Sequence, residues 1–300
     1  MDSKKVLIAL TAAVAAVSCH DYRDDQVKLV PEQVYLSTES TPVRYISPFE
    51  EDSYFAVIKS GKGLESAAVE VSTSATGLVK YNEENGTRYV NLPESIYDFP
   101  DNGKTVIIKK EQDRAILQLD WDDDELCRFL ISGKDDYVIP LKITNSSASI
   151  AKGRDLLLLH PVVPSVGLRA RNSREIAYSD TLSGQAVFTE RILLNHPIPT
   201  RDLTVSIAGA SAEGYASAAE AVPQGAFTLL STSVTIEKGQ SYADFSFRVD
   251  YDKFLSGNAM ATTSPCVTAV RITGISIDYL PLTQEIMYIP FRYQAPKNKR

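Results

Sequence analysis

Apolar and polar side chains alternate along several short stretches of this chain. Phe245, Phe247 and Val249 are separated by single polar residues. A period of two is typical of a strand that packs one face on a core and turns the other face to water. Segment 266–273 carries apolar side chains on both faces, which predicts a strand that is covered on both sides.

Helical patterns are scarce by comparison. No stretch of helical length keeps an apolar stripe with a period of 3.6 residues, so we expect helices only in connections. The alanine-rich segment 211–220 is the candidate for one short helix. Segment 81–87 carries the pair Asn85-Gly86 between β-prone stretches, which predicts a β-hairpin.

Four blocks of sequence recur in the same order at a nearly constant offset. Internal repetition of this kind indicates that one structural unit was duplicated. Residues 91–97 match 221–227, residues 105–112 match 234–240, residues 115–119 match 243–247, and residues 137–144 match 266–273. We infer that the chain contains two copies of one domain.

The predicted fold class is all-β, with two tandem antiparallel immunoglobulin-like β-sandwich domains. Pro161, Pro164 and Gly167, followed by a polar run, indicate a linker between the copies. The predicted divisions are a signal peptide at 1–18, a tether at 19–30, sandwich 1 at 31–163, a linker at 164–174, sandwich 2 at 175–294 and a basic tail at 295–300.

The amino end has the features of an export signal. Lys4 and Lys5 precede the apolar or small residues 6–17, a stretch too short to cross a bilayer, which needs about 20 residues. A cysteine at the junction makes the segment resemble a bacterial lipoprotein signal, which implies that Cys19 carries the lipid. We therefore expect an exported, lipid-anchored protein. A plain signal peptide with an incidental cysteine is the alternative.

Charge and cysteine content exclude some classes of function. The formal net charge is −7, and an acidic chain is a poor partner for nucleic acid, whose phosphates require clustered lysine and arginine. Apart from Cys19, the cysteines are Cys127 and Cys266, at non-equivalent places in the two copies. We expect both to be free, buried thiols, although export would permit a disulfide between them. No Cys/His spacing suits structural zinc.

Three sets of residues carry a resemblance to a known family. They are Tyr81-Asn82 with Gly86-Thr87-Arg88-Tyr89, then Leu92-Pro93 with Tyr97, and the run from Tyr137 to Ile143. These blocks resemble a domain of unknown function that is common in Bacteroidetes surface lipoproteins. The same domain precedes the catalytic barrel in certain endo-β-N-acetylglucosaminidases. The resemblance covers residues 31–162 and, in a more diverged form, residues 175–293.

The resemblance implies a sandwich domain in the outer-surface machinery that captures glycans. It transfers no catalytic residue, because the barrel is not part of this sequence. Acidic residues after Cys19 are similar to the signal that directs such lipoproteins to the outer leaflet, so the resemblance implies a lipid-anchored protein of the outer membrane that faces the cell exterior. Asp180-Thr181-Leu182 is similar to an O-glycosylation site of that group, with Thr181 as the acceptor.

Catalytic patterns are not found in the sequence. A Ser-His-Asp site needs a histidine held by an acid and facing a nucleophile, and no serine or cysteine lies in a nucleophile turn. His160 and His196 each precede a proline at the end of an apolar strand, where strand-end capping or surface exposure is expected. Phosphate-binding loops and dinucleotide motifs are absent as well. We expect that the protein is not an enzyme.

One acidic run suggests a metal. Asp120, Asp122 and Asp124 alternate like the start of a calcium loop, and calcium prefers hard oxygen ligands. The glycine and the terminal glutamate of such a loop are missing. A solvated acidic loop after a strand is the simpler interpretation, and a sugar contact by Trp121 with its neighbours is the third.

Aromatic residues are the candidates for glycan binding, because sugars stack C–H faces on flat rings and hydrogen-bond through their hydroxyls. The candidates are Trp121, Tyr81, Tyr89 and Tyr97. Against this, strand tyrosines usually pack across a sheet with a wet hydroxyl.

The function predicted from the sequence is a non-catalytic cell-surface lipoprotein that binds or presents glycan within a polysaccharide-uptake system. Its expected partners are a polysaccharide or glycoprotein glycan and outer-membrane uptake proteins, with no nucleic acid. A structural or adhesive lipoprotein that assembles by strand addition is the alternative. A remote alternative is a glycoside hydrolase, an activity that requires two carboxylates facing each other across a cleft.

Overall fold

The computed structural model describes residues 32–36, 41–50, 53–61, 65–99, 104–170, 172, 174–215, 220–256 and 265–295. The predicted signal peptide, the tether with Cys19, and residues 296–300 of the tail lie outside the described residues. Among the described residues, no helix is long and apolar enough to span a membrane. Contacts divide the chain after Pro161 into unit 1 and unit 2, with the segment Ser47–Glu51 grouped with unit 2.

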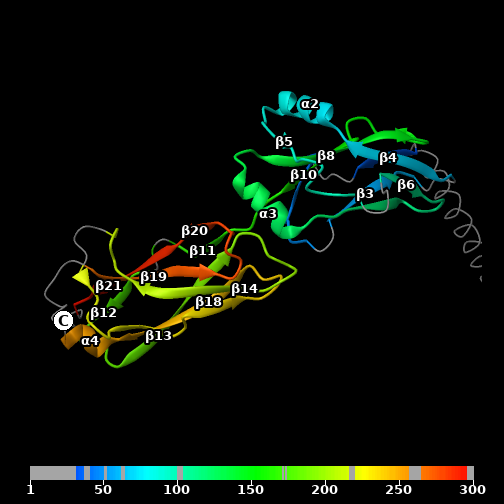
Figure 1. Cartoon of the computed structure of the whole chain (residues 1–300). Helices are drawn as coiled ribbons and strands as arrows, with labels where there is room; N and C mark the ends of the chain where they lie inside the picture. The colour runs from blue at the N-terminus through cyan, green and yellow to red at the C-terminus, as the bar shows by residue number, and fades with distance from the viewer. Residues whose placement is uncertain are drawn as a thin grey trace, which may run out of the picture. The chain divides into compact units, whose positions relative to one another are not determined.

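Unit 1 contains two sheets (Figure 1). The first has the order β7-β3-β1-β9, from Arg114–Leu119, Ser53–Lys59, Gln33–Leu36 and Ser149–Ile150. The second has the order β2-β10-β8-β4-β6, from Val43–Ile46, Leu156–Pro161, Tyr137–Ser146, Ala67–Thr73 and Thr105–Ile108, and β5 (Val90–Asn91) also pairs with β8. Helix α2 (Ala75–Asn85) follows β4, and helix α3 (Asp123–Ser132) follows β7.

Unit 2 also contains two sheets. The first has the order β16-β18-β13-β11-β20, from Phe227–Leu229, Tyr242–Asp250, Gln185–Leu194, Val166–Leu168 and Leu282–Gln284. The second has the order β12-β21-β19-β14-β17, from Ile176–Tyr178, Ile286–Tyr293, Cys266–Ile275, Leu203–Ala210 and Ser233–Ile236, and β15 (Glu220–Ala221) pairs with β19. Helix α4 (Tyr251–Ser256) follows β18.

The two units have equivalent topologies. Strands β7-β3-β1-β9 correspond to β18-β13-β11-β20, and β2-β10-β8-β4-β6 correspond to β12-β21-β19-β14-β17. The parallel pairs correspond as well: β1–β9 with β11–β20, β2–β10 with β12–β21, and β5–β8 with β15–β19. Each of the four repeated blocks begins on a pair of equivalent strands: β5 and β15, β6 and β17, β7 and β18, and β8 and β19. The predicted all-β fold of tandem sandwiches is therefore confirmed, although the sheets are mixed rather than purely antiparallel.

The core of unit 1 lies between its two sheets. The inward side chains of β3 and β7, such as Phe55 and Leu117, meet those of β4 and β8, such as Val71 and Leu141. A smaller apolar cluster lies on the other face of the second sheet, where α2 packs through Leu78 on Val138 and Leu158. Strand β8 is thus covered on both faces, as its equivalent β19 is in unit 2.

Three local predictions were wrong. Segment 81–87 is not a hairpin, because Tyr81 to Asn85 form the last part of α2 and Gly86 ends that helix. Segment 211–215 forms a turn rather than a helix, and Glu220 belongs to β15, while residues 216–219 lie outside the described residues. The predicted linker 164–174 contains β11, which is paired on both sides within unit 2.

Candidate functional site

Helix α2 places the first of the candidate tyrosines. The Ser74 hydroxyl accepts a hydrogen bond from the Gly77 N–H at 3.1 Å and starts the helix. Gly86 ends it in the left-handed conformation, with φ of 66°, which glycine adopts at little cost. Asn85-Gly86 therefore marks a helix end, and Tyr81 lies on the last turn of α2.

Asn82 then holds the returning chain against the helix. Its side-chain amide donates to the Tyr89 carbonyl at 2.8 Å, and its Oδ1 accepts from the Thr87 hydroxyl at 2.7 Å and from the Tyr89 N–H at 3.2 Å. These residues are among those that carry the family resemblance. Their physical role is to bring Tyr89 back beside Tyr81.

Tyr81 and Tyr89 are stacked, with ring centroids 6.3 Å apart at an angle of 21°. His160 of β10 meets the edge of Tyr89 at 5.3 Å and lies 5.1 Å from the Tyr45 ring of β2. Tyr45 and His160 are direct neighbours in the register of the parallel pair β2–β10. We call Tyr45, Tyr81, Tyr89 and His160 the tyrosine cluster. Tyr45 is 62% exposed, so the cluster opens to solvent on that side.

Burial changes the acid–base properties of the cluster. Burial raises the pKa of Tyr89, helped by the neighbouring Tyr45, with which it hydrogen-bonds. Burial also lowers the pKa of His160, partly offset by Asp136. Since an unperturbed histidine titrates near 6.5, His160 is neutral at pH 7. Its Nδ1 is buried without a hydrogen-bond partner in the described part of the chain.

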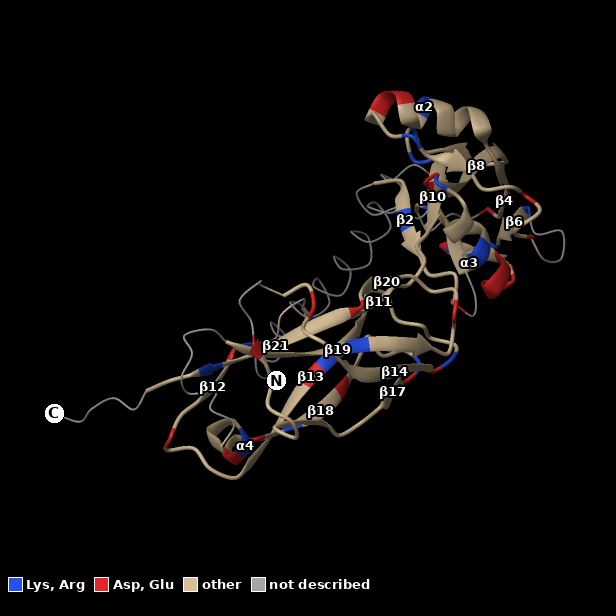
Figure 2. Cartoon of the chain, turned by 60° about the vertical axis from the view of Figure 1, so that its left-hand side comes forward, with Lys and Arg blue, Asp and Glu red and all other residues tan. Residues whose placement is uncertain are grey.

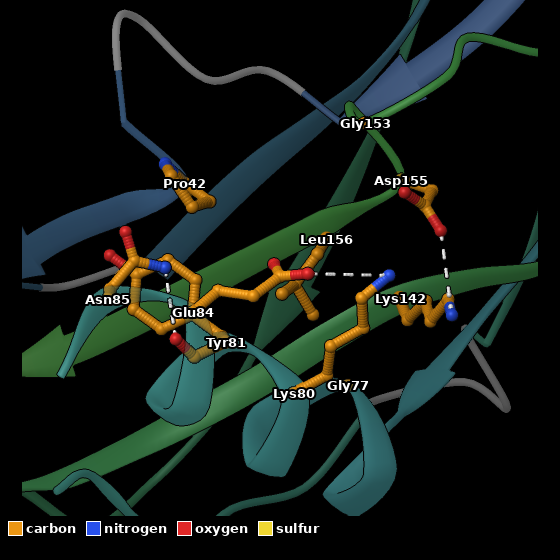
Figure 3. A pocket seen from close by; sticks show the side chains of 10 residues that line it. All are labelled: Pro42, Gly77, Lys80, Tyr81, Glu84, Asn85, Lys142, Gly153, Asp155 and Leu156. Atoms are coloured by element: carbon orange, nitrogen blue, oxygen red, sulfur yellow. Dashed lines mark hydrogen bonds and ion pairs between the residues drawn. The ribbon is translucent and has the colours of Figure 1, made fainter. Parts of the chain in front are cut away.

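A pocket of about 300 Å³ adjoins the cluster, and Tyr81 belongs to both (Figure 3). It lies between α2 and the neighbouring strands, and Leu156 and Pro42 are among its lining residues. Two ion pairs line it: Lys80 to Glu84 at 3.7 Å, and Lys142 to Asp155 at 3.6 Å. Both pairs are partly exposed, so they contribute little to stability and remain able to exchange partners.

The pocket therefore combines an aromatic side chain with charged donors and acceptors. A ring beside two carboxylates and two ammonium groups matches a polyhydroxylated ligand, whose C–H face is apolar and whose hydroxyls both donate and accept. The tyrosines also bury part of their surface against Leu78, so they have a structural role as well.

The other two aromatic candidates lie elsewhere in unit 1. Tyr97 is only 6% exposed and packs in the main core beside Phe99, so it offers no ring face to a sugar. Burial, with a smaller effect of Glu94, raises its pKa well above the usual range. The prediction of Tyr97 as a binding residue is wrong. Trp121 is half-buried against the main core and is not part of the tyrosine cluster, and its sugar contact stays a prediction.

The acidic run begins helix α3 rather than forming a metal loop. Asp122 caps the helix by accepting from the Glu125 N–H at 2.8 Å, and Asp124 lies in the first turn, where negative charge complements the helix dipole. Asp120 accepts from the Gln118 side chain. Figure 2 shows acidic residues gathered at α3. No group of three or more potential metal ligands occurs in the described residues, so the calcium site at Asp120, Asp122 and Asp124 is wrong.

The remaining site residues are placed as follows. Thr181 is exposed in a turn, with its hydroxyl 2.9 Å from that of Ser179, and its glycosylation stays a prediction. Cys127 and Cys266 are free and buried, as expected. His196 is exposed, but His160 is not a strand-end cap. The sequence reasoning missed Tyr45 and His160, although a histidine after four leucines was a visible signal.

One family model matches the chain, within unit 1. Residues 26–150 match a family model described as "-like, N-terminal domain". No curated protein sequence matches the chain. Among solved structures, a multidomain protein including DUF1735 from Bacteroides ovatus is similar, with 16% identity, a TM-score of 0.32, and coverage of 52% of this chain and 50% of that protein.

Two further structures are similar. A candidate carbohydrate-binding protein from Bacteroides ovatus has 14% identity and a TM-score of 0.35, over 86% of this chain and 64% of that one. EndoBT-3987 from Bacteroides thetaiotamicron, solved with a Man5GlcNAc product, has 15% identity and a TM-score of 0.32, over 49% of this chain and 35% of that one. The chain thus spans half to two thirds of the first two proteins and about a third of EndoBT-3987.

The family-model match falls on the unit that carries the motifs of the resemblance. A DUF1735 protein and EndoBT-3987 are both among the similar structures. At these identities and TM-scores, the likeness assigns no ligand or activity to this chain.

Proposed function

We propose that unit 1 binds a glycan at the tyrosine cluster and the adjoining pocket, without catalysis. The observation that carries this proposal is the position of Tyr81, whose ring belongs both to the aromatic cluster and to a pocket lined by two ion pairs. A sugar stacked on the exposed cluster would reach Glu84 and Asp155 with its hydroxyls. The pocket volume lies at the lower end of the range for small-ligand sites and suits a few sugar rings at most.

The cellular setting belongs to the same proposal. Cys19 would anchor the protein by lipid in the outer membrane, with the sandwiches outside the cell, where unit 1 binds or presents polysaccharide or glycoprotein glycan to uptake proteins. Labelling with palmitate tests the anchor. The label should be lost in Cys19→Ala and retained in the wild type.

Affinity gel electrophoresis on a glycan panel tests binding by the protein that begins after Cys19. We expect retardation by at least one polysaccharide, weakened about tenfold, or about 1.4 kcal/mol, by Tyr81→Ala and by Tyr45→Ala. Tyr54→Ala is the matched control, because Tyr54 is also exposed in unit 1 but lies on the other sheet.

Trp121→Ala separates the proposed site from the earlier candidate. Retention of binding supports the tyrosine cluster, whereas loss of binding in Trp121→Ala with unchanged binding in Tyr81→Ala moves the site to the start of α3. Absence of retardation across a broad panel would contradict the proposal.

A second candidate function, structural assembly by strand addition, has one observation in its favour. In unit 2 the outer edge of β18 is covered by β16. At the equivalent edge of β7 in unit 1, the described residues provide only the single bridge between Asp98 and Asp120. Uncovered edges present backbone groups that can pair with a strand from a neighbour.

Ile116→Pro tests this alternative. The Asp120 N–H donates to the Asp98 carbonyl on the outer side of β7, and the Asp113 carbonyl accepts from the Lys59 N–H on the side of β3. Because backbone groups alternate along a strand, the even-numbered residues of β7 direct their N–H groups to the open edge. A proline at position 116 removes an outward N–H and leaves the ladder to β3 intact. If the protein assembles through this edge, light scattering should show assemblies of the wild type and monomers of the variant. A monomeric wild type at high concentration would contradict the alternative.

A further inference from the structure

Unit 2 contains a pocket of its own, of about 380 Å³, whose lining includes none of the candidate site residues predicted from the sequence. Residues of β12, β13 and β18 line it, and α4 contributes Tyr251. Phe188 and Phe247, stacked at 5.6 Å, form part of its wall. Among these apolar groups lies the carboxylate of Glu190.

The duplication shows that this carboxylate replaces a core residue. Glu190 is opposite Phe245 in the pairing of β13 with β18. The repeated blocks align Phe245 with Leu117 of unit 1, and the partner of Leu117 in β3 is Phe55. Phe55 is 2% exposed and belongs to the core of unit 1. Unit 2 therefore has a glutamate where unit 1 fills the space between its sheets with an aromatic ring.

A carboxylate at such a position destabilises the fold unless it has a partner. Glu190 makes no hydrogen bond or ion pair with a described residue, and burial raises its pKa, with Arg169 acting in the opposite direction. The Tyr251 hydroxyl is also desolvated and has no partner in the described part of the chain. Half-buried polar groups without partners destabilise a fold, and a ligand that satisfies both would remove that cost.

We propose that the pocket between β12, β13 and α4 binds an organic ammonium group, with Glu190 as its counter-ion. The ammonium donates to the Glu190 carboxylate and to the Tyr251 oxygen, and its aliphatic stem packs on Phe188. Aromatic faces attract cations, which adds to the attraction of the carboxylate. The charged lining is Glu175, Glu190 and Arg174, and the excess of acid disfavours an anion.

Glu175 is paired with Arg292 at 3.0 Å. Of the two carboxylates in the lining, Glu190 is therefore the one that can pair with a ligand. The same chemistry could be offered by a free alkylamine or by the lysine side chain of a protein. The proposal is independent of glycan binding in unit 1, because the two sites share no residue.

Titration calorimetry of the protein that begins after Cys19 tests the proposal with two probes. Butylammonium represents a free amine, and Nα-acetyl-lysine-N-methylamide represents a lysine side chain. We expect at least one of these probes to bind. The ratio of their two affinities shows whether the site prefers a free amine or a lysine side chain. Butanol and glucose are the neutral comparisons. Equal binding of a neutral probe, or absence of binding by both amines at millimolar concentration, would overturn the proposal.

Three variants locate the site. Glu190→Gln should weaken amine binding at least tenfold, while Glu237→Gln, which removes an exposed glutamate of the same unit, should leave it unchanged. Glu190→Phe restores the residue type of unit 1 and should abolish amine binding while the melting temperature stays equal or rises. Glycan retardation should be the same in all three. Undiminished amine binding in Glu190→Gln would contradict the assignment of Glu190, whether or not unit 1 binds a glycan.

Discussion

At the residue scale, His160 shows how one side chain can be defined by its surroundings. It is a polar residue on a strand of leucines, placed between Tyr45 and Tyr89, with one ring nitrogen buried without a partner among the described residues. Such a histidine is tolerated while it is neutral. Protonation would put a positive charge into a half-buried site, at a cost that the nearby Asp136 offsets in part.

We predict that unit 1 loses stability as the pH falls. The folded pKa of His160 is lowered, so below about pH 6.5 the unfolded chain binds more protons than the folded chain, and the free energy of unfolding decreases. The single tryptophan of the chain, Trp121, lies in unit 1, so its fluorescence follows the unfolding of that unit. The urea concentration at the unfolding midpoint of the wild type should decrease when the pH is lowered from 7 to 5.

The variant His160→Gln provides the control, because glutamine does not titrate. Its midpoint should change less than that of the wild type over the same interval. Parallel pH profiles for the two proteins would show that another group dominates.

At the element scale, α2 demonstrates that a short helix can depend on its ends rather than on its faces. Leu78 is the only fully buried residue of this helix. Its start depends on the Ser74 cap and its end on Gly86, and the chain that follows is tied back by Asn82. This arrangement, rather than a continuous apolar stripe, positions Tyr81 and Tyr89.

Asn82→Ala should therefore affect both stability and binding. It removes three hydrogen bonds, so we expect a loss of about 1–3 kcal/mol in the free energy of unfolding of unit 1, followed by tryptophan fluorescence in urea. Glycan retardation should also weaken, because Tyr89 is no longer held beside Tyr81. Asn145→Ala, at an exposed position of β8, should change neither property. If Asn82→Ala behaves like that control, the hydrogen bonds of Asn82 do not position the Tyr89 ring.

At the scale of the whole molecule, duplication provided two scaffolds that then diverged locally. The strand orders and the parallel pairs are the same in the two units. Among the described residues, several differences are local: α2 has no equivalent helix in unit 2, β16 covers an edge only in unit 2, and Glu190 occupies the position of Phe55. Helix α2 and Glu190 each line the pocket of their own unit.

Separate cores predict separate responses to mutation. Phe247→Ala removes a ring that is almost fully buried in unit 2 and should cost about 3–5 kcal/mol there. Calorimetry should show one transition shifted to lower temperature, while the midpoint followed by Trp121 fluorescence stays the same. A common shift in both signals would mean that the two units unfold as one.

The sequence alone determined the strands, the duplication and the fold class. An alternation with a period of two, as at Phe245, Phe247 and Val249, is a local consequence of one-sided burial and can be recognised without a structure. The free, buried state of Cys127 and Cys266 was predictable as well. Tyr81 and Tyr89 were predicted individually, from motifs whose geometry was not evident.

The tertiary structure decided the rest, because the missing information was not local. Asn85-Gly86 has the same sequence in a hairpin and at a helix end, and the contacts of the folded chain select the helix: the Asn82 hydrogen bonds to Thr87 and Tyr89 and the packing of Leu78 on the sheet. Tyr45 and His160 are brought together by a parallel strand pair more than a hundred residues apart in the chain. The Glu190 pocket exists because a strand partner sets which face that side chain occupies. Pairing across the sheet, rather than the pattern along the chain, brings these groups into contact.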